Sequence, residues 1–313
     1  MLFRSRSFGR ENKLDMYAGL AAYSYRYMAP DNFPYDEAAR RWYATTYLPL
    51  SQDAAFAFVT YHARATRYVK LRDVDTFALT EDFLLGHDVK AEARFALGLS
   101  DVSHGYIEGR LEAAYRLYRG DNLLSLRLLA RTAYMPARSA VEGFFVNYHL
   151  DAEVKNAFPR LWIGRFHVRL RSTMRHNDLF NSSSYLGGDT GLRGYPSLHF
   201  EGENLLVVNA EYRSLPINFF TLHLGFVLFY DGGAVYGGPD PRDPTREQPF
   251  VYRQTLGLGI RALFPQFDRE VLRVDFGFPM SGDAGEVGTW FSVSFAQVWG
   301  QKPRVRSATM IDP

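Results

Sequence analysis

Long runs of alternating polar and apolar residues most constrain the fold of this 313-residue chain. A period of two places successive side chains on opposite faces of a β-strand. Twelve segments show it: 14–28, 54–68, 85–99, 104–118, 122–135, 139–154, 160–174, 202–213, 218–231, 252–264, 269–279 and 287–299. Most are longer than the usual strand of a globular sheet and suit tilted strands that cross about 25 Å of membrane. An all-β, antiparallel fold is therefore predicted.

The alternation leaves two architectures open. In 202–213, Asn209, Glu211 and Arg213 share the face opposite Val208. A soluble two-layer sandwich also alternates in this way, with its polar face in water. Twelve long strands would give such a sandwich an unusually large core, whereas in a closed barrel each apolar face meets lipid and no strand edge is left open. The alternation therefore favours an antiparallel transmembrane β-barrel of about twelve strands over the sandwich.

Composition agrees with a barrel and excludes other classes. The 20 Tyr and 25 Phe are natural for a barrel with aromatic girdles. Nowhere do about 18 uncharged apolar residues run together, so a membrane-spanning helix is excluded. The 36 basic and 34 acidic residues alternate within the same strands, which gives no basic patch for nucleic acid. With no cysteine, disulfides and thiolate metal sites are excluded.

No pattern of residues points to catalysis or to a cofactor. The eight histidines are never at metal-ligand spacing. No serine lies on a nucleophile elbow. Gly188, Gly191 and Gly194 are spaced somewhat like a phosphate-binding loop, but no helix is predicted to follow them. We therefore predict that the chain is not an enzyme, has no catalytic residues, and binds no metal or cofactor.

One glycine-rich segment, 185–200, interrupts the alternating runs and reads YLGGDTGLRGYPSLHF. It contains Arg193, whose candidate partners are Glu211 and Asp231 in the next two predicted strands. A guanidinium enclosed by a barrel needs paired carboxylates, and its planar fork suits them. The alternatives are an exposed loop arginine, and an Asp231 that only forms a turn before two glycines.

The segment GGDTGLRGYP resembles the signature of the sixth extracellular loop in the BamA/TamA-type bacterial surface-antigen family. Members of that family are barrels that insert or translocate proteins. Further matches follow in the family's order: NAEYRSLP (209–216), VLFYDGGAVYG (227–237), LGLGIRALFP (256–265), LRVDFGFPM (272–280) and WFSVSFAQVW (290–299). The specific resemblance covers 185–299, and before that it is limited to strand length and alternation.

The resemblance implies a function and a set of site residues. The loop arginine of the family folds into the lumen and pairs with acids of the inner wall, which would be Arg193 with its lumen partners Glu211 and Asp231. The signature loop itself would comprise Gly187, Gly188, Gly191, Leu192, Arg193, Gly194 and Tyr195. The implied location is the outer membrane of a Gram-negative type of cell. The implied partners are outer-membrane lipid, unfolded or translocating client proteins and periplasmic accessory subunits.

The resemblance also implies that the chain is a fragment. Family barrels have sixteen strands with the loop after the eleventh, whereas here it follows the seventh predicted strand. Residues 1–299 are therefore predicted to be the last twelve strands of a barrel truncated at its N-terminus, and the alternative is a genuinely smaller barrel. Residues 1–10 contain no apolar core of signal-peptide length. Weak pairing of the first and last strands would form a seam, with 287–299 on one side.

The connections between strands give further predictions. Segments 118–121 and 155–159 are predicted as short turns, and 232–251 as a solvated loop. Residues 42–48 are ambiguous within a long loop, 29–53, and the tail 300–313 is predicted to be disordered. Two alternative functions remain: a membrane anchor or secretion pore for a missing N-terminal domain such as a hydrolase, and a simple diffusion porin.

Overall fold

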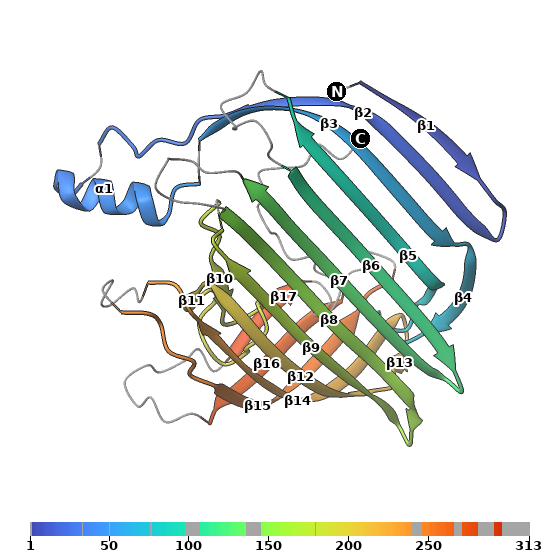
Figure 1. Cartoon of the computed structure of the whole chain (residues 1–313). Helices are drawn as coiled ribbons and strands as arrows, with labels where there is room; N and C mark the ends of the chain where they lie inside the picture. The colour runs from blue at the N-terminus through green and yellow to red at the C-terminus, as the bar shows by residue number, and fades with distance from the viewer. Residues whose placement is uncertain are drawn as a thin grey trace.

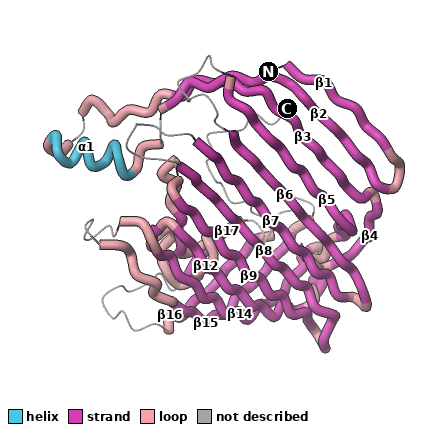
Figure 2. Tube along the Cα trace, in the orientation of Figure 1, coloured by secondary structure: helices cyan, strands magenta, loops and turns pink. Residues whose placement is uncertain are grey.

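The computed structural model consists almost entirely of β-strands. It describes residues 2–32, 34–49, 51–75, 77–97, 107–135, 145–178, 180–239, 246–265, 271–280 and 291–295. The strands of these residues form one 15-stranded sheet and one 2-stranded sheet, and all their pairings are antiparallel. The described residues contain one helix, α1 (Glu37–Thr46). The predicted all-β, antiparallel fold is confirmed (Figures 1 and 2).

The main sheet is a path in which each strand pairs with the next. In order it runs through β1 (Leu2–Phe8), β2 (Asn12–Tyr25), β3 (Gln52–Ala65), β5 (Thr80–Ala96), β6 (Ile107–Arg119), β7 (Asn122–Met135), β8 (Phe145–Leu161), β9 (Gly164–His176), β12 (Asn204–Ser214), β14 (Leu222–Tyr236), β15 (Arg253–Leu263), β16 (Leu272–Pro279) and β17 (Phe291–Phe295). Two short strands lie off this path: β4 (Arg67–Arg72) pairs with β5, and β13 (Ile217–Phe219) pairs with β14.

Each of the twelve predicted segments contains a strand of the main path, and one strand of that path was missed. This is β1, whose seven residues pair with β2 from Leu2 opposite Leu20 to Phe8 opposite Leu14. With β1 counted, eight strands of the path precede the signature segment instead of seven. Parts of the predicted segments 104–118, 139–154 and 287–299 lie outside the described residues, as does the tail 300–313.

Two predicted connections were wrong. Segment 155–159 is not a turn, because β8 continues to Leu161 and its register with β9 shifts between Ala157 and Arg160. A β-bulge of this kind accommodates Pro159 within a strand. The predicted loop 232–251 begins too early, because β14 continues through Gly232 to Tyr236.

The ambiguous run 42–48 is largely helical. Its first five residues belong to α1, which begins after Asp36. The Asp36 carboxylate accepts a hydrogen bond from the backbone N–H of Ala39 at 2.8 Å, which is a typical N-cap contact. The helix projects from the long connection between β2 and β3 (Figure 1).

The path of the sheet has two ends. Among the described residues, β1 pairs only with β2 and β17 only with β16, so closure into a barrel is not observed. Within those same residues, no helix has the length and apolarity needed to cross a membrane. The sheet nevertheless curves strongly (Figure 1), which gives it a concave inner face and a convex outer face.

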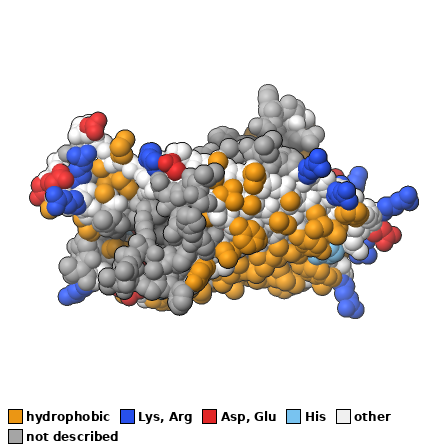
Figure 3. All heavy atoms as spheres, turned by 45° about the horizontal axis from the view of Figure 1, so that its top comes forward, with side chains coloured by type: hydrophobic (Ala, Val, Ile, Leu, Met, Phe, Trp, Pro, Cys, Tyr) orange, Lys and Arg blue, Asp and Glu red, His pale blue; other side chains and the backbone are white. Residues whose placement is uncertain are grey.

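The two faces reverse the distribution found in soluble proteins. On β15, Leu256 and Ile260 are 47% and 51% exposed, whereas Thr255 and Arg261 are 0% and 6% exposed. Hydrophobic side chains accordingly cover a broad outer surface (Figure 3). Soluble domains rarely expose apolar patches of this kind, so the outer face suits an apolar surrounding. The predicted alternation therefore has its charged side chains on the inner face.

The connection between β4 and β5 folds onto the inner face. We call its described residues, 73–75 and 77–79, the inner turn. Val74 packs with Leu123 and Ala157 of β7 and β8, whereas Phe77 packs with Leu263 and Val271 near β15 and β16. The inner turn therefore joins two parts of the sheet that are far apart in strand order.

Candidate functional site

The signature segment, residues 185–200, folds back onto the inner face. Its ends are joined by a small sheet in which β10 (Ser184–Leu186) pairs with β11 (Phe200–Gly202). Apolar side chains anchor it to β12 and β14 in one buried cluster: Leu186, Leu192, Tyr195, Phe200, Leu205, Val207 and Val235. Burial of this cluster places the tip of the segment beside the charged residues of the strands.

Glycine is required at two points of this tip. Gly191 and Gly194 have φ angles of 124° and 92°, which residues with a side chain rarely adopt. A Cβ at Gly191 would lie 2.8 Å from Val207 Cγ1, and one at Gly194 would lie 3.0 Å from the carbonyl carbon of Gly277. Gly187 and Gly188 also have positive φ angles. The tip thus combines turns that favour glycine with close backbone packing.

Arg193 lies at the centre of the site and is 2% exposed. Its Nε and Nη2 atoms donate to Asp231 Oδ2 and Oδ1 at 2.6 Å and 2.8 Å, which is a bidentate pair. Its Nη1 atom lies 2.7 Å from Glu211 Oε1. The structure therefore brings together the arginine and both acids selected from the sequence, and Arg193 is not an exposed loop residue.

Asp231 is not a turn residue, because it lies inside β14 opposite Asn209 of β12. Asn209 Nδ2 donates both to Asp231 Oδ1, at 2.7 Å, and to the carbonyl oxygen of Gly191, at 2.8 Å. The backbone N–H of Arg193 also donates to Asp231 Oδ2, at 3.1 Å. A single carboxylate thus holds both the side chain and the backbone of the loop tip.

A third acid, Asp275 of β16, was not selected from the sequence. Its Oδ2 atom lies 3.5 Å from Arg193 Nη1. The Asp275 carboxylate also accepts two hydrogen bonds of 2.7 Å, one at Oδ1 from Arg261 Nη1 and one at Oδ2 from Arg273 Nη2. The alternation places Asp275 on the charged face, but many strand residues share that property. Nothing in the sequence indicates that it reaches the same arginine as two acids on other strands.

An aromatic ring completes the site. The guanidinium carbon of Arg193 lies 3.5 Å from the centre of the Phe229 ring, which is a cation–π contact. On its neighbouring strand this ring occupies the space beside Gly257, where a Cβ would lie 2.1 Å from Phe229 Cζ. Phe229 falls among the polar positions of β14 in the alternation, and an aromatic residue there is the signal that could have identified it.

The site contains four arginines and three carboxylates, so its formal net charge is only +1. Arginines 193, 213, 261 and 273 lie among Glu211, Asp231 and Asp275, and Arg213 Nε donates to Glu211 Oε2 at 2.7 Å. Burial would lower the pKa of Arg193, but the charges of Asp231 and Glu211 raise it above its ordinary value. Arg193 is therefore held as a cation, and the site acts as an electrostatic clamp on the loop tip.

Replacing Phe229 with Leu should remove the cation–π contact while keeping an apolar side chain beside Gly257. We expect a loss of about 1–2 kcal/mol in the free energy of unfolding. Urea unfolding in detergent micelles, followed by tryptophan fluorescence, measures it. The control is Phe226→Leu on the outer face of the same strand. Equal losses in the two variants would contradict a special role for the Phe229 ring.

Among the described residues, no group of three or more His, Asp or Glu side chains is placed to hold a metal ion.

Comparison with known proteins assigns the chain to a family. The model of the Omp85 superfamily domain matches residues 86–299, which run from within β5 through β17 and include the signature segment and all three acids around Arg193. No curated protein matches the chain. Members of this superfamily are outer-membrane proteins that handle client proteins during assembly or translocation. With most of its length matched, the chain belongs to the Omp85 superfamily.

Proposed function

We propose that this chain forms a transmembrane β-barrel in the outer membrane and acts in the insertion, assembly or translocation of proteins there. The observation that carries the proposal is the reversed distribution of side chains, with apolar residues exposed on the outer face and charged residues buried on the inner face. A transmembrane barrel needs this arrangement because its outer face meets lipid. Family membership supplies the class of function.

The clamp around Arg193 has a defined role in this proposal. It ties the loop tip to β12, β14 and β16 through Glu211, Asp231 and Asp275. β12 and β14 are neighbours in the sheet, whereas β15 separates β16 from β14, so the clamp adds a tie between strands that are not neighbours. A rigid wall of this kind would leave the movement needed for a client to the last strand of the path, β17, which pairs only with β16 among the described residues and would offer its other edge to an incoming strand.

A folding assay tests the proposal. The full chain is reconstituted in liposomes, and a urea-denatured outer-membrane barrel protein is added as client. We expect the folded client, measured by its shift in an unheated gel, to accumulate several-fold faster than in empty liposomes. Arg193→Ala should remove the acceleration, whereas Arg41→Ala, on the exposed side of α1, should keep it. Equal client folding in loaded and empty liposomes would refute the proposal.

A diffusion porin and an anchor or secretion pore for another domain are the other functions predicted from the sequence. The inner turn argues against an open porin. Val74 and Phe77 are 2% and 9% exposed, and Arg213 Nη1 donates to the carbonyl oxygen of Val74 at 3.1 Å. The turn is thus packed against the wall from both sides and occupies the inner space together with the signature segment.

Replacing both Val74 and Phe77 with Ser should release the inner turn and increase conductance several-fold in planar bilayers. The loss of two buried apolar side chains removes the contacts that hold the turn inward. The control is Tyr68→Ser on β4, whose side chain is 65% exposed. If the double variant conducts no more than the unmodified chain, the inner turn does not limit the pore.

A further inference from the structure

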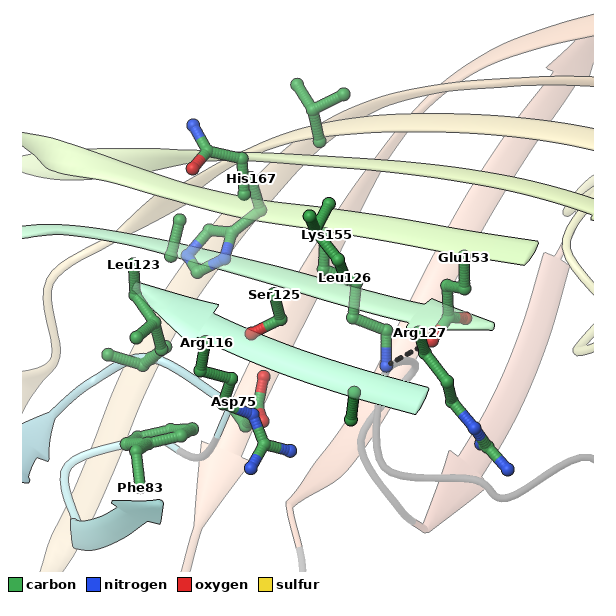
Figure 4. Close-up of a pocket in the computed structure, with 15 residues that line it drawn as sticks. Asp75, Phe83, Arg116, Leu123, Ser125, Leu126, Arg127, Glu153, Lys155 and His167 are labelled. Carbon is green, nitrogen blue, oxygen red and sulfur yellow. Dashed lines mark ion pairs between the residues drawn. The ribbon is translucent and has the colours of Figure 1, made fainter. Parts of the chain in front are cut away.

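A second polar site lies on the inner face, away from Arg193. It is a cavity of about 140 Å³ between the inner turn and strands β6 to β9. Its charged and hydrogen-bonding lining residues are Asp75, Arg116, Ser125, Arg127, Glu153, Lys155 and His167 (Figure 4). None of these residues belongs to the clamp, and the inference below does not depend on the proposed function.

The strand register places three cationic residues on the same face of the sheet as the Ser125 hydroxyl group. Arg116 of β6 and Lys155 of β8 lie directly opposite Ser125 of β7, on its two sides. Arg127 is two residues further along β7 and therefore points to the same face. Directly opposite residues in an antiparallel pair are about 5 Å apart, so Arg116 and Lys155 flank Ser125, and Arg127 adds a third cation on the same face. In Figure 4 Arg116 and Lys155 lie on two sides of Ser125, and Arg127 extends away from it.

The two carboxylates that line the cavity, Asp75 and Glu153, do not compensate all three cations. Glu153 pairs with Lys155 at 3.2 Å and with Arg169 at 2.7 Å. Within the described part of the chain, neither Arg116 nor Arg127 has an ion pair or a side-chain hydrogen bond. Other arginines of the inner face do form ion pairs. Arg171, for example, pairs with Asp151 at 2.8 Å. Three cations and two carboxylates line the cavity, so it carries an excess positive charge.

A buried histidine adds a hydrogen-bonding atom without a partner. His167 lines the same cavity and is 5% exposed. Its Nε2 atom is buried and has no hydrogen-bond partner among the described residues. A buried polar atom in this condition is unfavourable unless something occupies the cavity and bonds to it. A neutral imidazole that carries its proton on Nε2 would donate to an acceptor there.

From these observations we propose that the cavity binds a small multivalent oxyanion, with phosphate as the representative ligand. The fork of Arg116 would contact two oxygens beside the Ser125 hydroxyl, and the exposed Arg127 side chain would turn toward the cavity to add a second fork. A phosphate group fits the cavity of about 140 Å³, because about 10–15 Å³ on the same measure already holds one water molecule. The same chemistry would accept free phosphate or the phosphate of a larger phosphomonoester.

Isothermal titration of the full chain in detergent micelles tests this site. Sodium phosphate is added in a phosphate-free buffer, with sodium chloride at matched ionic strength as the reference. We expect saturable binding of one phosphate per chain, and binding about tenfold weaker or more for Arg116→Gln/Arg127→Gln. The matched control is Arg110→Gln, on the same face of β6 about 20 Å away and paired with Glu112. It should change the affinity by less than about twofold.

Two results would overturn the proposal: phosphate heats equal to those of chloride, or equal affinities in the double variant and in Arg110→Gln. If the double variant does not fold, Arg127→Gln alone serves, because the Arg127 side chain is exposed. A threefold or larger loss, on the order of 0.7 kcal/mol, is then expected. Parallel titration with glycerol 3-phosphate distinguishes the sources, since tighter binding than that of phosphate would point to an organic phosphomonoester.

Discussion

Replacing Asp231 with Ala is expected to release the signature segment and to destabilise the fold by about 3–5 kcal/mol. The substitution removes the bidentate partner of Arg193 at 2.6 Å and 2.8 Å, and leaves the four arginines of the site with only Glu211 and Asp275. It also removes acceptors from Asn209 and from the loop backbone. A buried pair that loses one partner is far more costly than one that loses both.

Urea unfolding in detergent micelles measures this loss, and limited proteolysis within residues 185–200 reports release of the segment. The matched control is Glu112→Ala, which also removes an inner-face carboxylate from an arginine pair, but one whose side chain is 37% exposed. Its cost should stay within about 1 kcal/mol.

The double variant Arg193→Met/Asp231→Leu should lose less free energy of unfolding than Asp231→Ala, because it removes the buried cation together with its carboxylate. Equal stability of Asp231→Ala and the unmodified chain would rule out the clamp.

Replacing Gly277 with Val should push the loop tip away from β16. A Cβ at this position would lie 2.7 Å from both the Cα and N atoms of Gly194, which are backbone atoms that cannot rotate aside. We expect a loss of about 1–3 kcal/mol in the free energy of unfolding, together with faster cleavage in the signature segment.

Gly109→Val is the matched control for this substitution. It lies in β6, and an added Cβ would meet Thr132 Cγ2 at an ordinary contact distance of 3.7 Å. The same change should therefore leave cleavage of the signature segment unchanged. Identical cleavage rates in the two variants would show that close packing at Gly277 does not hold the loop.

The sequence predicts the parts of this molecule that depend on local pattern. Alternation assigns Glu211 and Asp231 to the charged face, and the strands place both within 3 Å of the Arg193 side chain. Alternation gives the face on which a side chain lies, but not its position relative to residues of other strands. It could not show that Asp275, two strands beyond Asp231, reaches the same guanidinium. A pattern within one strand cannot give distances between strands that the curvature of the sheet brings together.

The remaining errors have local causes. β1 was missed because seven residues with alternating arginines resemble a charged N-terminal segment as much as a strand. The predicted turn at 155–159 was wrong because β8 continues through Pro159, which the register shift between β8 and β9 accommodates. The inner turn left no pattern, because burial of Val74 and Phe77 depends on contacts with distant strands.

Those contacts have a consequence for how the chain folds. Phe77 meets Leu263 and Val271, which are nearly two hundred positions later in the sequence. Hairpins between consecutive strands can form early, since their contacts are local. The packing site of Phe77 forms only when the strands that carry Leu263 and Val271 have joined the sheet, so its docking must be among the last steps. We expect the burial of Phe77 to follow a slow kinetic phase that tracks completion of the curved sheet.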